Sequence, residues 1–580
     1  MTVRPFKPTD EQRRIIEHTG SAFISACPGS GKTRVMVERA RILLRDNQAG
    51  CGVAFLSFTN AAISELEVRL RQDGLLPSPS FPHFIGTFDS FIWQFLIAPF
   101  GVPRCKEPPR LIPDKDKLTI RPNDQVRGLP LKCFDRATGN IIPEGAQRLG
   151  YNPAANARLT KAYETIARNS RAWFLERGEL DFADVRDIAK NQLQDGTTAP
   201  RLAAALSARF RELIVDEAQD CNPADLEIIK WLRDAGMAVK VICDPHQSIY
   251  EFRGGVTEQL IAFGKTFQAQ DQLFISGNFR SSDHICKAIV VLRNKDSRTV
   301  VDQALGDYRD ETTQIHVLSY PGRSVPATIG AKFQELVASL NVDISRCPVL
   351  AKTRNSGCRA IGQPPEMGLQ DMTLRLAEAV TDFHFSFEVG NQKTALEELH
   401  RIVLELGGHL KDISYHQYLK AQGIDHFMWR PRILNLAREL RYDPVVYADA
   451  NAWLDRAKAL LAPCLPAGGP TINQKLRRNA HLANALAVAP ISSPASKTIH
   501  AVKGMQFPAV CVVMTSYNAK AILDYLETGE PADQAEDARE IYVAASRAER
   551  LLVIAVPKSQ AKRIADHLVK TSAKITLIEL

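Results

Sequence analysis

The chain has 580 residues, of which 45% are hydrophobic and 24% charged, and its formal net charge is +8. A chain of this length exceeds a single ordinary core and predicts about three or four domains. The composition is that of a globular protein, and the mild positive charge is compatible with a nucleic-acid partner without requiring one.

The amino terminus and the cysteines narrow the class of protein further. The opening stretch, MTVRPFKPTDEQRRIIEHTG, is polar and lacks the apolar core of a secretory signal, and no apolar run reaches the roughly 18 residues of a membrane span. The 11 cysteines include no C-x-x-C pair, which argues against a zinc ribbon or an iron–sulfur cluster. We therefore expect reduced thiols in a cytoplasmic protein that has no membrane partner.

Short apolar runs alternate with helical patterns in the first part of the chain. Strands are expected at AFISA (22–26) and VAFLSF (53–58), and helices at about 34–45 and 61–71. The alternation resumes with three further apolar runs: ELIVDEAQD, AVKVICD and DQLFISG. Because parallel strands need helical crossovers, this order predicts a parallel sheet covered by helices.

The alternating pattern is interrupted twice. Residues 100–178 are first rich in proline and charge and then helical, and residues 358–490 are mostly helical. The sequence thus predicts an α/β protein with two parallel-sheet cores, each carrying an inserted, mainly helical subdomain. The expected cores are 1–99 with 179–275, and 276–357 with 491–580.

The stretch ISACPGSGKT, residues 24–33, is typical of a phosphate-binding loop. In such a loop backbone N–H groups wrap the phosphates, a lysine reaches the β and γ phosphates, and a hydroxyl holds magnesium, which are roles that fit Lys32 and Thr33. Ala26 replaces the usual first glycine and Pro28 cannot donate, but most donors come from residues 29–33 and the following helix. A plain glycine-rich turn is the alternative. The expected nucleotide-binding residues here are Ala26, Cys27, Pro28, Gly29, Ser30, Gly31, Lys32, Thr33 and Arg34.

Two later strands end in further polar groups. LIVDEAQD delivers Asp216, placed to hold magnesium, and Glu217, placed to orient the attacking water, at the edge where open α/β sheets bind ligands. An acidic strand end that caps the next helix is the alternative. KVICDPHQSIYEFRGG brings Gln247 to hydrogen-bond a γ-phosphate or a water, and Phe252 and Arg253 follow as a ring and a cation suited to nucleic acid. A turn with a packing phenylalanine is the alternative for the latter two.

Nine segments occur in the order, and at about the spacing, of the motifs of superfamily 1 helicases of the UvrD/Rep type. They are ACPGSGKT, LSFTNAA, IGTFDSF, LDFADV, LIVDEAQD, CDPHQSIYEFRGG, SGNFRSS, TIHAVKGMQF and REIYVAASRA. The chain therefore resembles this family over residues 8–558. The resemblance implies two RecA-like P-loop cores, ATP and Mg²⁺ as cofactors, and 3′ to 5′ movement on single-stranded or tailed duplex DNA.

The resemblance also implies roles for residues of the nucleotide cleft. Gln12 in PTDEQ resembles the adenine-reading glutamine, and Phe279 lies where an aromatic ring stacks on the adenine. Arg280 in NFRSS and Arg547 in AASRA match two arginine fingers. Two cations arriving from the second core stabilise the charge that develops on the γ-phosphate only when the cleft is closed.

Other positions resemble the family's DNA contacts. They are Phe58, Thr59, Asn60, Thr87 and Phe88, together with His500 and Lys503 in TIHAVKG, which fall where the family contacts DNA and links it to the nucleotide. Aromatic platforms with phosphate contacts bind single strands without reading their sequence. Core packing is the alternative for Phe58 and Phe88.

The chain departs from the family pattern at several positions. Phe279 and Phe252 replace the usual Tyr and Trp, and Asp89 stands where a histidine is usual. Gln506 replaces a glutamate that contacts the nucleotide sugar, although its neutral amide can still hydrogen-bond a ribose hydroxyl. The second insertion does not align with that of the housekeeping repair helicases, and its basic run RPRILNLARELR favours a solvated helix face.

Three functions compete. The first is an ATP-dependent DNA helicase or translocase. The second is a DNA-activated ATPase subunit that serves a partner nuclease, because compact helicases of this type resemble those paired with OLD-family nucleases in phage defence, as in Gabija systems. The third is a P-loop GTPase or small-molecule kinase, for which the nearest approach to N-K-x-D, Asn294-Lys295-Asp296-Ser297, lacks the final acid. The sequence leaves the oligomeric state open.

Overall fold

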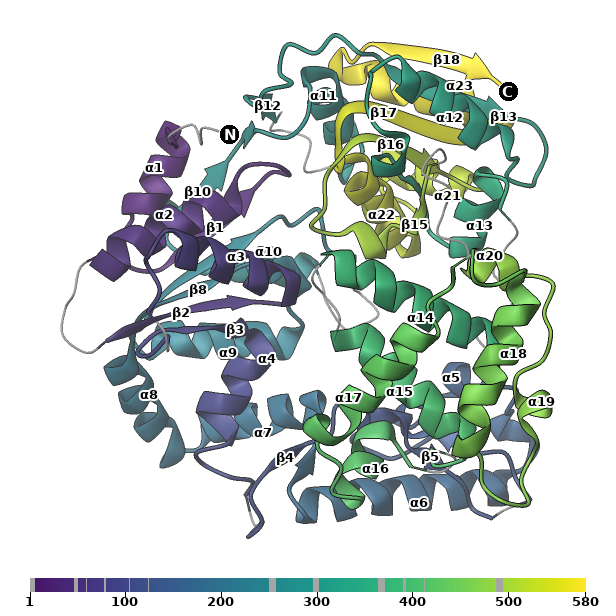
Figure 1. The fold of residues 1–580 in the computed structure, drawn as a ribbon. Helices are drawn as coiled ribbons and strands as arrows, with labels where there is room; N and C mark the ends of the chain where they lie inside the picture. The colour runs from purple at the N-terminus through teal and green to yellow at the C-terminus, as the bar shows by residue number, and fades with distance from the viewer. Residues whose placement is uncertain are drawn as a thin grey trace. The chain divides into compact units, whose positions relative to one another are not determined.

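A computed structural model gives the fold of the chain. It describes residues 6–45, 51–58, 60–77, 80–103, 105–123, 125–249, 257–295, 302–363, 371–389, 393–410, 413–443, 445–486 and 494–580. The chain divides into two compact units (Figure 1). The core unit comprises Met1–Leu96, Ala189–Glu366 and Ile491–Leu580, and the accessory unit comprises Ile97–Ile188 and Met367–Pro490.

The first sheet of the core unit has six parallel strands in the order β10-β1-β9-β8-β2-β3. Its strands are β1 Ala22–Ala26, β2 Gly52–Ser57, β3 Phe84–Thr87, β8 Phe210–Val215, β9 Ala238–Cys243 and β10 Gln272–Ile275. Most of their residues are apolar because both faces of a parallel sheet are covered. The order places the carboxyl ends of β1, β9 and β8 side by side, which brings three polar motifs to one edge.

Helices cover the first sheet and connect its strands. They are α1 Asp10–Glu17, α2 Lys32–Arg45, α3 Asn60–Gln72, α4 Phe88–Phe91, α8 Thr198–Arg209, α9 Pro223–Asp234 and α10 Thr257–Gly264. α1, α2 and α3 share one apolar core with strand residues such as Ile24 and Ile214. The predicted strands at AFISA and VAFLSF are confirmed as β1 and β2, and the two predicted helices are confirmed as α2 and α3.

The second sheet also has six parallel strands, in the order β15-β14-β16-β17-β13-β18. Its strands are β13 Ile315–Tyr320, β14 Val349–Ala351, β15 Ser496–Thr498, β16 Phe507–Val513, β17 Ala548–Pro557 and β18 Ile575–Glu579. A short pair, β11 Gly277–Asn278 and β12 Gln303–Ala304, links the two sheets in sequence. The predicted α/β class with two parallel-sheet cores is confirmed.

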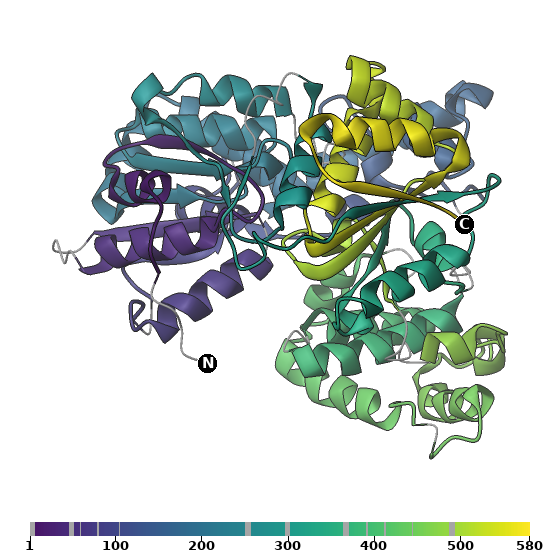
Figure 2. The ribbon, with the colours of Figure 1, turned by 90° about the horizontal axis from the view of Figure 1, so that it is seen from above.

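Helices lie on both faces of the second sheet, as Figure 2 shows. They are α11 Asp283–Val291, α12 Thr328–Ala338, α13 Arg354–Ala360, α21 Ala519–Thr528, α22 Ala535–Ala545 and α23 Lys558–Leu568. Alternation along β13 explains the two layers, because Val317 packs with α11, α21, α22 and α23, whereas Leu318 packs with α12 and α13.

The accessory unit is mainly helical. Its first segment contains β4 Arg110–Leu111, β5 Thr119–Ile120, β6 Leu129–Pro130, α5 Pro143–Arg148, α6 Ala157–Glu176 and β7 Glu179–Leu180. Its second segment contains α14 Met372–Val389, α15 Lys393–Leu406, α16 Tyr415–Ala421, α17 His426–Glu439, α18 Ala450–Leu461, α19 Ile472–Lys475 and α20 Leu482–Leu486. Two polar contacts join the segments: Lys420 pairs with Glu179 at 2.6 Å, and the His416 ring lies 3.3 Å from the Asp114 carboxylate.

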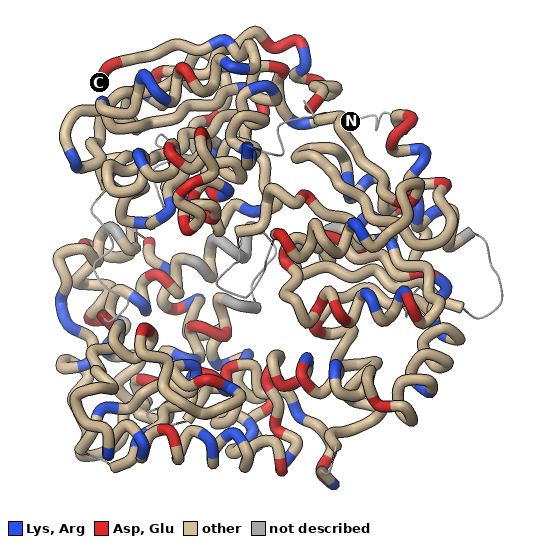
Figure 3. Tube along the Cα trace, turned by 180° about the vertical axis from the view of Figure 1, so that it is seen from behind, with Lys and Arg blue, Asp and Glu red and all other residues tan. Residues whose placement is uncertain are grey.

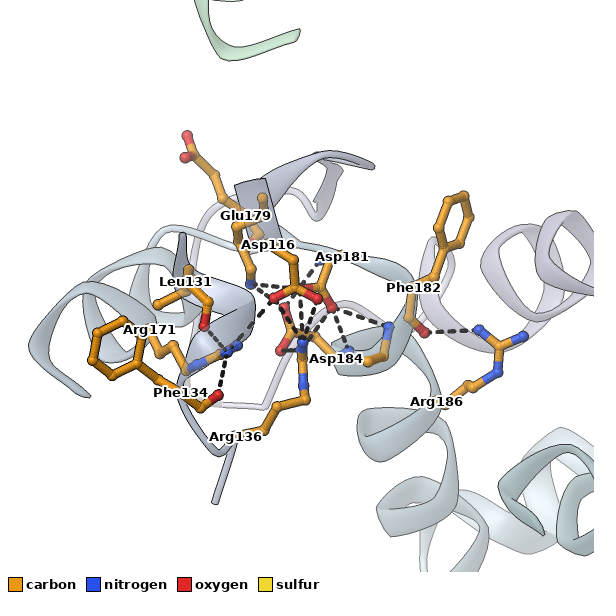
Figure 4. Close-up of polar contacts among 12 residues, drawn as sticks. Asp116, Leu131, Phe134, Arg136, Arg171, Glu179, Asp181, Phe182, Asp184 and Arg186 are labelled. Carbon is orange, nitrogen blue, oxygen red and sulfur yellow. Dashed lines mark hydrogen bonds and ion pairs between the residues drawn. The ribbon is translucent and has the colours of Figure 1, made fainter. Parts of the chain in front are cut away.

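The LDFADV motif, residues 180–185 at the start of α7 Phe182–Gln194, forms a buried ionic cluster (Figure 4). Asp181 accepts hydrogen bonds from both terminal nitrogens of Arg136, at 2.6 and 3.0 Å. Lys115, which has no exposed surface, donates to the Asp184 carboxylate. Asp181 also accepts from the Asp184 backbone amide (2.9 Å), so the motif caps α7 while it holds the first inserted segment.

Asp184→Asn is expected to lower the stability of the accessory unit by about 3 kcal/mol, because removing one partner leaves the buried charge of Lys115 poorly compensated. Hydrogen exchange of the α6 amides measures this change locally. Asp234→Asn is the matched control: its pair with Lys230 has side chains 53% and 46% exposed, and an exposed pair contributes less than about 1 kcal/mol. Unchanged α6 exchange in Asp184→Asn contradicts the assignment.

Candidate active site

A tight loop, residues 27–31, joins β1 to α2. Gly29 and Gly31 have φ angles of +68° and +76°, a left-handed backbone that glycine adopts without the steric cost that other residues bear. The Ser30 amide donates to the Cys27 carbonyl (3.3 Å), and the Val35 amide of α2 donates to the Gly31 carbonyl (2.9 Å). The first amides of a helix lack partners within it, so the loop and the start of α2 together suit an anion such as phosphate.

Gln12 supports this loop from α1. Its side-chain nitrogen donates to the Ser30 carbonyl (2.9 Å), and its side chain also completes a capping box with Thr9. Gln12 is buried, as are Ala26 and Cys27 at the end of β1. None of these three residues lines the cavity above the loop.

A cavity of about 430 Å³ lies over the loop, and both sheets of the core unit contribute to its walls. The sequence-predicted residues that line it are Pro28, Gly29, Ser30, Gly31, Lys32, Thr33, Arg34, Asp216, Glu217, Gln247, Phe279, Arg280, Lys503, Gln506 and Arg547. Residues as far apart in the sequence as Pro28 and Arg547 thus converge on one space.

Asp216 and Glu217 directly follow β8. Glu217 has a φ of +54°, a left-handed conformation that is uncommon for a residue with a Cβ and that occurs often at functional sites. One of its carboxylate oxygens lies 3.9 Å from the Lys32 Nζ, and the other accepts from Gln219. Burial alone would raise the pKa of Glu217, but the charges of Lys32, Lys503 and Arg547 and the hydrogen bond from Gln219 together outweigh burial and lower it. Burial also opposes the charge of Lys32, yet the carboxylates around it raise the pKa of Lys32, so both groups are ionised at neutral pH.

Arg547 reaches the same cavity from the segment between α22 and β17. It is 2% exposed, and one terminal nitrogen donates to the Gln247 side-chain oxygen at 2.6 Å. The amide nitrogen of Gln247 in turn donates to Asp244 (2.8 Å), and the Arg547 Nε donates to the Val543 carbonyl (3.1 Å). Burial lowers the pKa of Arg547. The Arg547 guanidinium, which comes from the second sheet, is thereby hydrogen-bonded to Gln247, which follows a strand of the first sheet.

Arg280 enters the cavity from the segment after β11. Its Nε donates to the Gln506 side-chain oxygen (3.2 Å), so the residue that replaces the family's glutamate is directed to this arginine. Main-chain contacts fix the segment: the Phe279 amide donates to the Gly29 carbonyl (2.8 Å), and a Cβ at Gly29 would lie 2.5 Å from the Asn278 Oδ1. The Phe279 ring remains 38% exposed at the cavity wall.

Residues 8–268 match the family model of the UvrD/REP helicase N-terminal domain. This UvrD/REP domain contains the phosphate loop, Asp216, Glu217 and Gln247, whereas Arg280 and Arg547 lie beyond the matched residues. The structure therefore shows that the second sheet contributes to the cavity, and the family match does not cover that contribution.

The chain is homologous to UvrD- and PcrA-type proteins. It is 28% identical to the ATP-dependent DNA helicase UvrD1 of Mycobacterium tuberculosis (strain ATCC 25618 / H37Rv) over 321 residues, which are 51% of this chain and 41% of the relative. It is 25% identical to the ATP-dependent DNA helicase PcrA of Bacillus subtilis (strain 168) over 299 residues, which are 50% of this chain and 39% of the relative. The match thus spans about two fifths of the length of these curated relatives.

Thr33 and Asp216 are the residues of the UvrD/REP domain that suit a magnesium ion. Both line the cavity beside the phosphate loop and offer a hydroxyl and a carboxylate oxygen, the hard donors that Mg²⁺ takes. Over the described part of the chain no group of three or more His, Cys, Asp or Glu residues is placed to hold a metal. A site with few protein ligands fits Mg²⁺, which usually keeps water and takes substrate phosphates as its remaining ligands.

Lys503, which the resemblance places where the family contacts DNA and links it to the nucleotide, lines the cavity. Its Nζ donates to Asp220, at the end of the LIVDEAQD motif, and both side chains are nearly buried. Asp220, Ala62 and Arg69 also line the cavity without having been predicted. The third acid of LIVDEAQD was an available signal for Asp220, and Ala62 ends the quoted motif LSFTNAA, whereas no motif included Arg69.

The predicted DNA contacts of the UvrD/REP domain are placed only in part. The Phe88 ring is buried and packs against the ring of Phe58, which is partly exposed, with 5.3 Å between the two ring centroids. Thr87 is the N-cap of α4, where its hydroxyl accepts from the Ser90 amide (3.2 Å). The described structure thus gives Phe88 and Thr87 structural contacts and leaves part of the Phe58 ring open.

The remaining predicted DNA residues are more sparsely described. His500, on the short 3₁₀ turn His500–Val502, has its ring 3.3 Å from the Glu540 carboxylate. Thr59, Phe252 and Arg253 lie outside the described residues, and only the backbone of Asn60 is described. Among the described helices, none combines the length and the apolar character needed to cross a membrane.

Proposed function

We propose that the chain is an ATP-dependent DNA helicase or translocase that moves 3′ to 5′ along single-stranded DNA. The observation that carries the proposal is the convergence of Lys32 and Glu217 from the first sheet with Arg280 and Arg547 from the second on one cavity. The names of the homologous helicases support the same activity. We place it in the cytoplasm, where ATP and DNA are both available.

In this proposal each polar group acts on the terminal phosphate. The loop amides and Lys32 bind the phosphates, and Glu217 orients the attacking water and accepts its proton. Thr33 and Asp216 would hold Mg²⁺, which supplies positive charge to the phosphates when bound. Arg280 and Arg547 then stabilise the charge that develops during transfer.

The division of the cavity between two sheets suggests how hydrolysis moves the strand. The proposed cores are residues 1–99 with 179–275 and residues 276–357 with 491–580, and the insertions are 100–178 and 358–490. Binding of ATP would draw the two cores together through contacts such as Arg547 to Gln247, and release of product would free them. Alternating closure with a grip on DNA produces stepwise movement.

The proposed DNA track uses residues on the core unit. Phe58, which Thr59 and Asn60 follow in the sequence, would offer a ring and polar groups, and His500, Phe252 and Arg253 would add further contacts. Lys and Arg are intermixed with Asp and Glu along most of the described chain (Figure 3), so the net charge of +8 does not by itself mark a track. The track must therefore be located by mutation.

Single-stranded DNA is expected to stimulate ATP hydrolysis by the purified chain, and a 3′-tailed duplex to be unwound in preference to a 5′-tailed or blunt one. Because binding through phosphates releases counterions, the apparent DNA affinity should fall steeply between two salt concentrations, with a slope of about −0.7 per phosphate contact for a single strand. ATPase and unwinding assays on the four substrates measure both. Hydrolysis that is indifferent to DNA and to salt overturns the proposal.

The accessory unit favours a second candidate. Its segment Met367–Pro490 lies outside the matched residues and forms a helical core of its own around residues such as Trp453 and Leu399. A segment that the family model does not cover would suit a DNA-activated ATPase subunit that serves a partner nuclease, as in Gabija-like phage defence, with little unwinding of its own. DNA-stimulated hydrolysis without unwinding supports this candidate, and unwinding by the chain alone contradicts it.

A further inference from the structure

A second contact runs beside the one between Arg547 and Gln247. Asp244, in the turn after β9, accepts from the Gln247 amide nitrogen (2.8 Å) and from the Tyr542 hydroxyl of α22 (3.5 Å). Because Asp244 occupies the NH₂ end of Gln247, the carbonyl end of that amide faces Arg547. Two residues of one turn thus meet two residues of one helix–strand segment, since Tyr542 lies five positions before Arg547.

The far side of Tyr542 is held by an ion pair. The Arg293 guanidinium lies 5.5 Å from the Tyr542 ring centroid, and its terminal nitrogen lies 2.5 Å from the Asp302 carboxylate. The side chains of Arg293 and Asp302 are 5% and 1% exposed. The His246 ring adds an edge contact, with its centroid 5.9 Å from that of Tyr542.

Asp244, Tyr542, Arg293 and Asp302 are buried in the core unit and do not line the cavity, unlike Gln247. Buried polar and charged groups cost free energy unless they are paired, and a well-packed apolar set is often as stable as a buried ion pair. Stability alone therefore does not account for the arrangement. Each group limits the positions that the next can take, and the series ends at Gln247. Such an arrangement suits a role in fixing the orientation of the Gln247 side chain.

We propose that Tyr542, held by Arg293 and Asp302, is a positioning residue for ATP hydrolysis, which docks the segment that carries Arg547 onto the turn that carries Gln247. The inference rests on the proposed ATPase function. Tyr542 touches neither the nucleotide cavity nor the reacting atoms, and it acts through Asp244. The geometry of Arg547 at the transition state then depends on a hydroxyl and a carboxylate remote from the phosphate.

The test compares Tyr542→Phe, Asp302→Asn and the double variant with the wild-type chain. Tyr542→Phe removes one hydroxyl and keeps the packing of the ring, so it serves where Asp302→Asn folds poorly. Glu212→Gln is the matched control, because the Arg39–Glu212 pair is also a buried 2.5 Å pair, with side chains 8% and 4% exposed, and does not line the cavity. The measurements are kcat and the KM for ATP with saturating single-stranded DNA, and the melting temperature.

Each single variant is expected to lower kcat about tenfold, while the KM for ATP changes less than about threefold. The double variant should be no slower than the slower single variant, because Asp302 acts through Tyr542. Glu212→Gln should lower the melting temperature and keep kcat. Multiplying effects in the double variant, or an equal loss of kcat in Glu212→Gln, overturns the inference.

The outcomes also separate this inference from the proposed function. A wild-type chain that hydrolyses no ATP, with or without DNA, overturns both. Wild-type turnover that all three variants retain unchanged overturns the positioning role alone and leaves the ATPase function standing.

Discussion

Glu217→Gln is expected to slow ATP hydrolysis about a thousandfold while ATP binding persists. The amide keeps the size of the side chain but can neither take a proton from water nor attract it as strongly. The variant removes the ion pair between Glu217 and Lys32, whose Nζ lies 3.9 Å from the carboxylate. Lys32 therefore stays available to the phosphates. Single-turnover hydrolysis with saturating single-stranded DNA measures the chemical step, and a fluorescent ATP analogue measures binding.

Two companion variants sharpen this result. Lys32→Ala should also abolish turnover, but through loss of nucleotide binding, so the binding assay separates the two causes. Glu227→Gln is the matched control, because Glu227 on α9 forms a partly exposed pair with Lys190, does not line the cavity and should keep the wild-type rate. A Glu217→Gln chain with near wild-type hydrolysis contradicts the assigned role.

Arg547→Ala is expected to lower kcat about a thousandfold, the lower range found for arginine fingers, with a smaller effect on ATP affinity. The guanidinium is buried against Gln247 at 2.6 Å and faces the cavity from the second sheet. Arg547→Lys should restore little activity, because an ammonium cannot reproduce the planar, forked arrangement of donors that a guanidinium presents. Steady-state ATPase assays across ATP concentrations separate kcat from KM.

Arg550→Ala provides the control for this substitution. Arg550 lies three positions further along the chain, pairs with Glu311 at 2.9 Å and does not line the cavity. It should therefore keep the wild-type kcat. Equal losses in the two variants would show that damage to β17, rather than removal of a cation from the phosphate, explains the effect of Arg547→Ala.

Local sequence patterns were enough to predict the elements that build the site. AFISA forms β1 over Ala22–Ala26, because a short apolar run before a glycine-rich turn fits a buried parallel strand. The helix expected over 34–45 begins slightly earlier, at Lys32, since the last loop residues already take up the first turn. The strand ends that carry Asp216 and Gln247 follow from the same pattern.

The local sequence pattern could not predict contacts between segments that are distant in the chain. The pairing of Lys503 with Asp220, and the burial of Phe88 against Phe58, depend on how separate elements pack and leave no local periodicity. Family resemblance indicated that Arg280 belongs to the cleft, but its contact with Gln506 depends on where the two sheets meet. Aromatic residues in particular serve core and surface roles with the same spacing.

The main-chain hydrogen bond from Phe279 to Gly29 has a consequence for how force is transmitted. A Cβ at Gly29 would clash with Asn278 and Arg280, so the phosphate loop and the segment after β11 are in close contact. We expect the two segments to move together. A phosphate that changes the conformation of the loop would therefore also move the segment that carries Arg280. Side-chain substitutions in the cleft would then remove the chemistry while the mechanical linkage between nucleotide and second sheet survives.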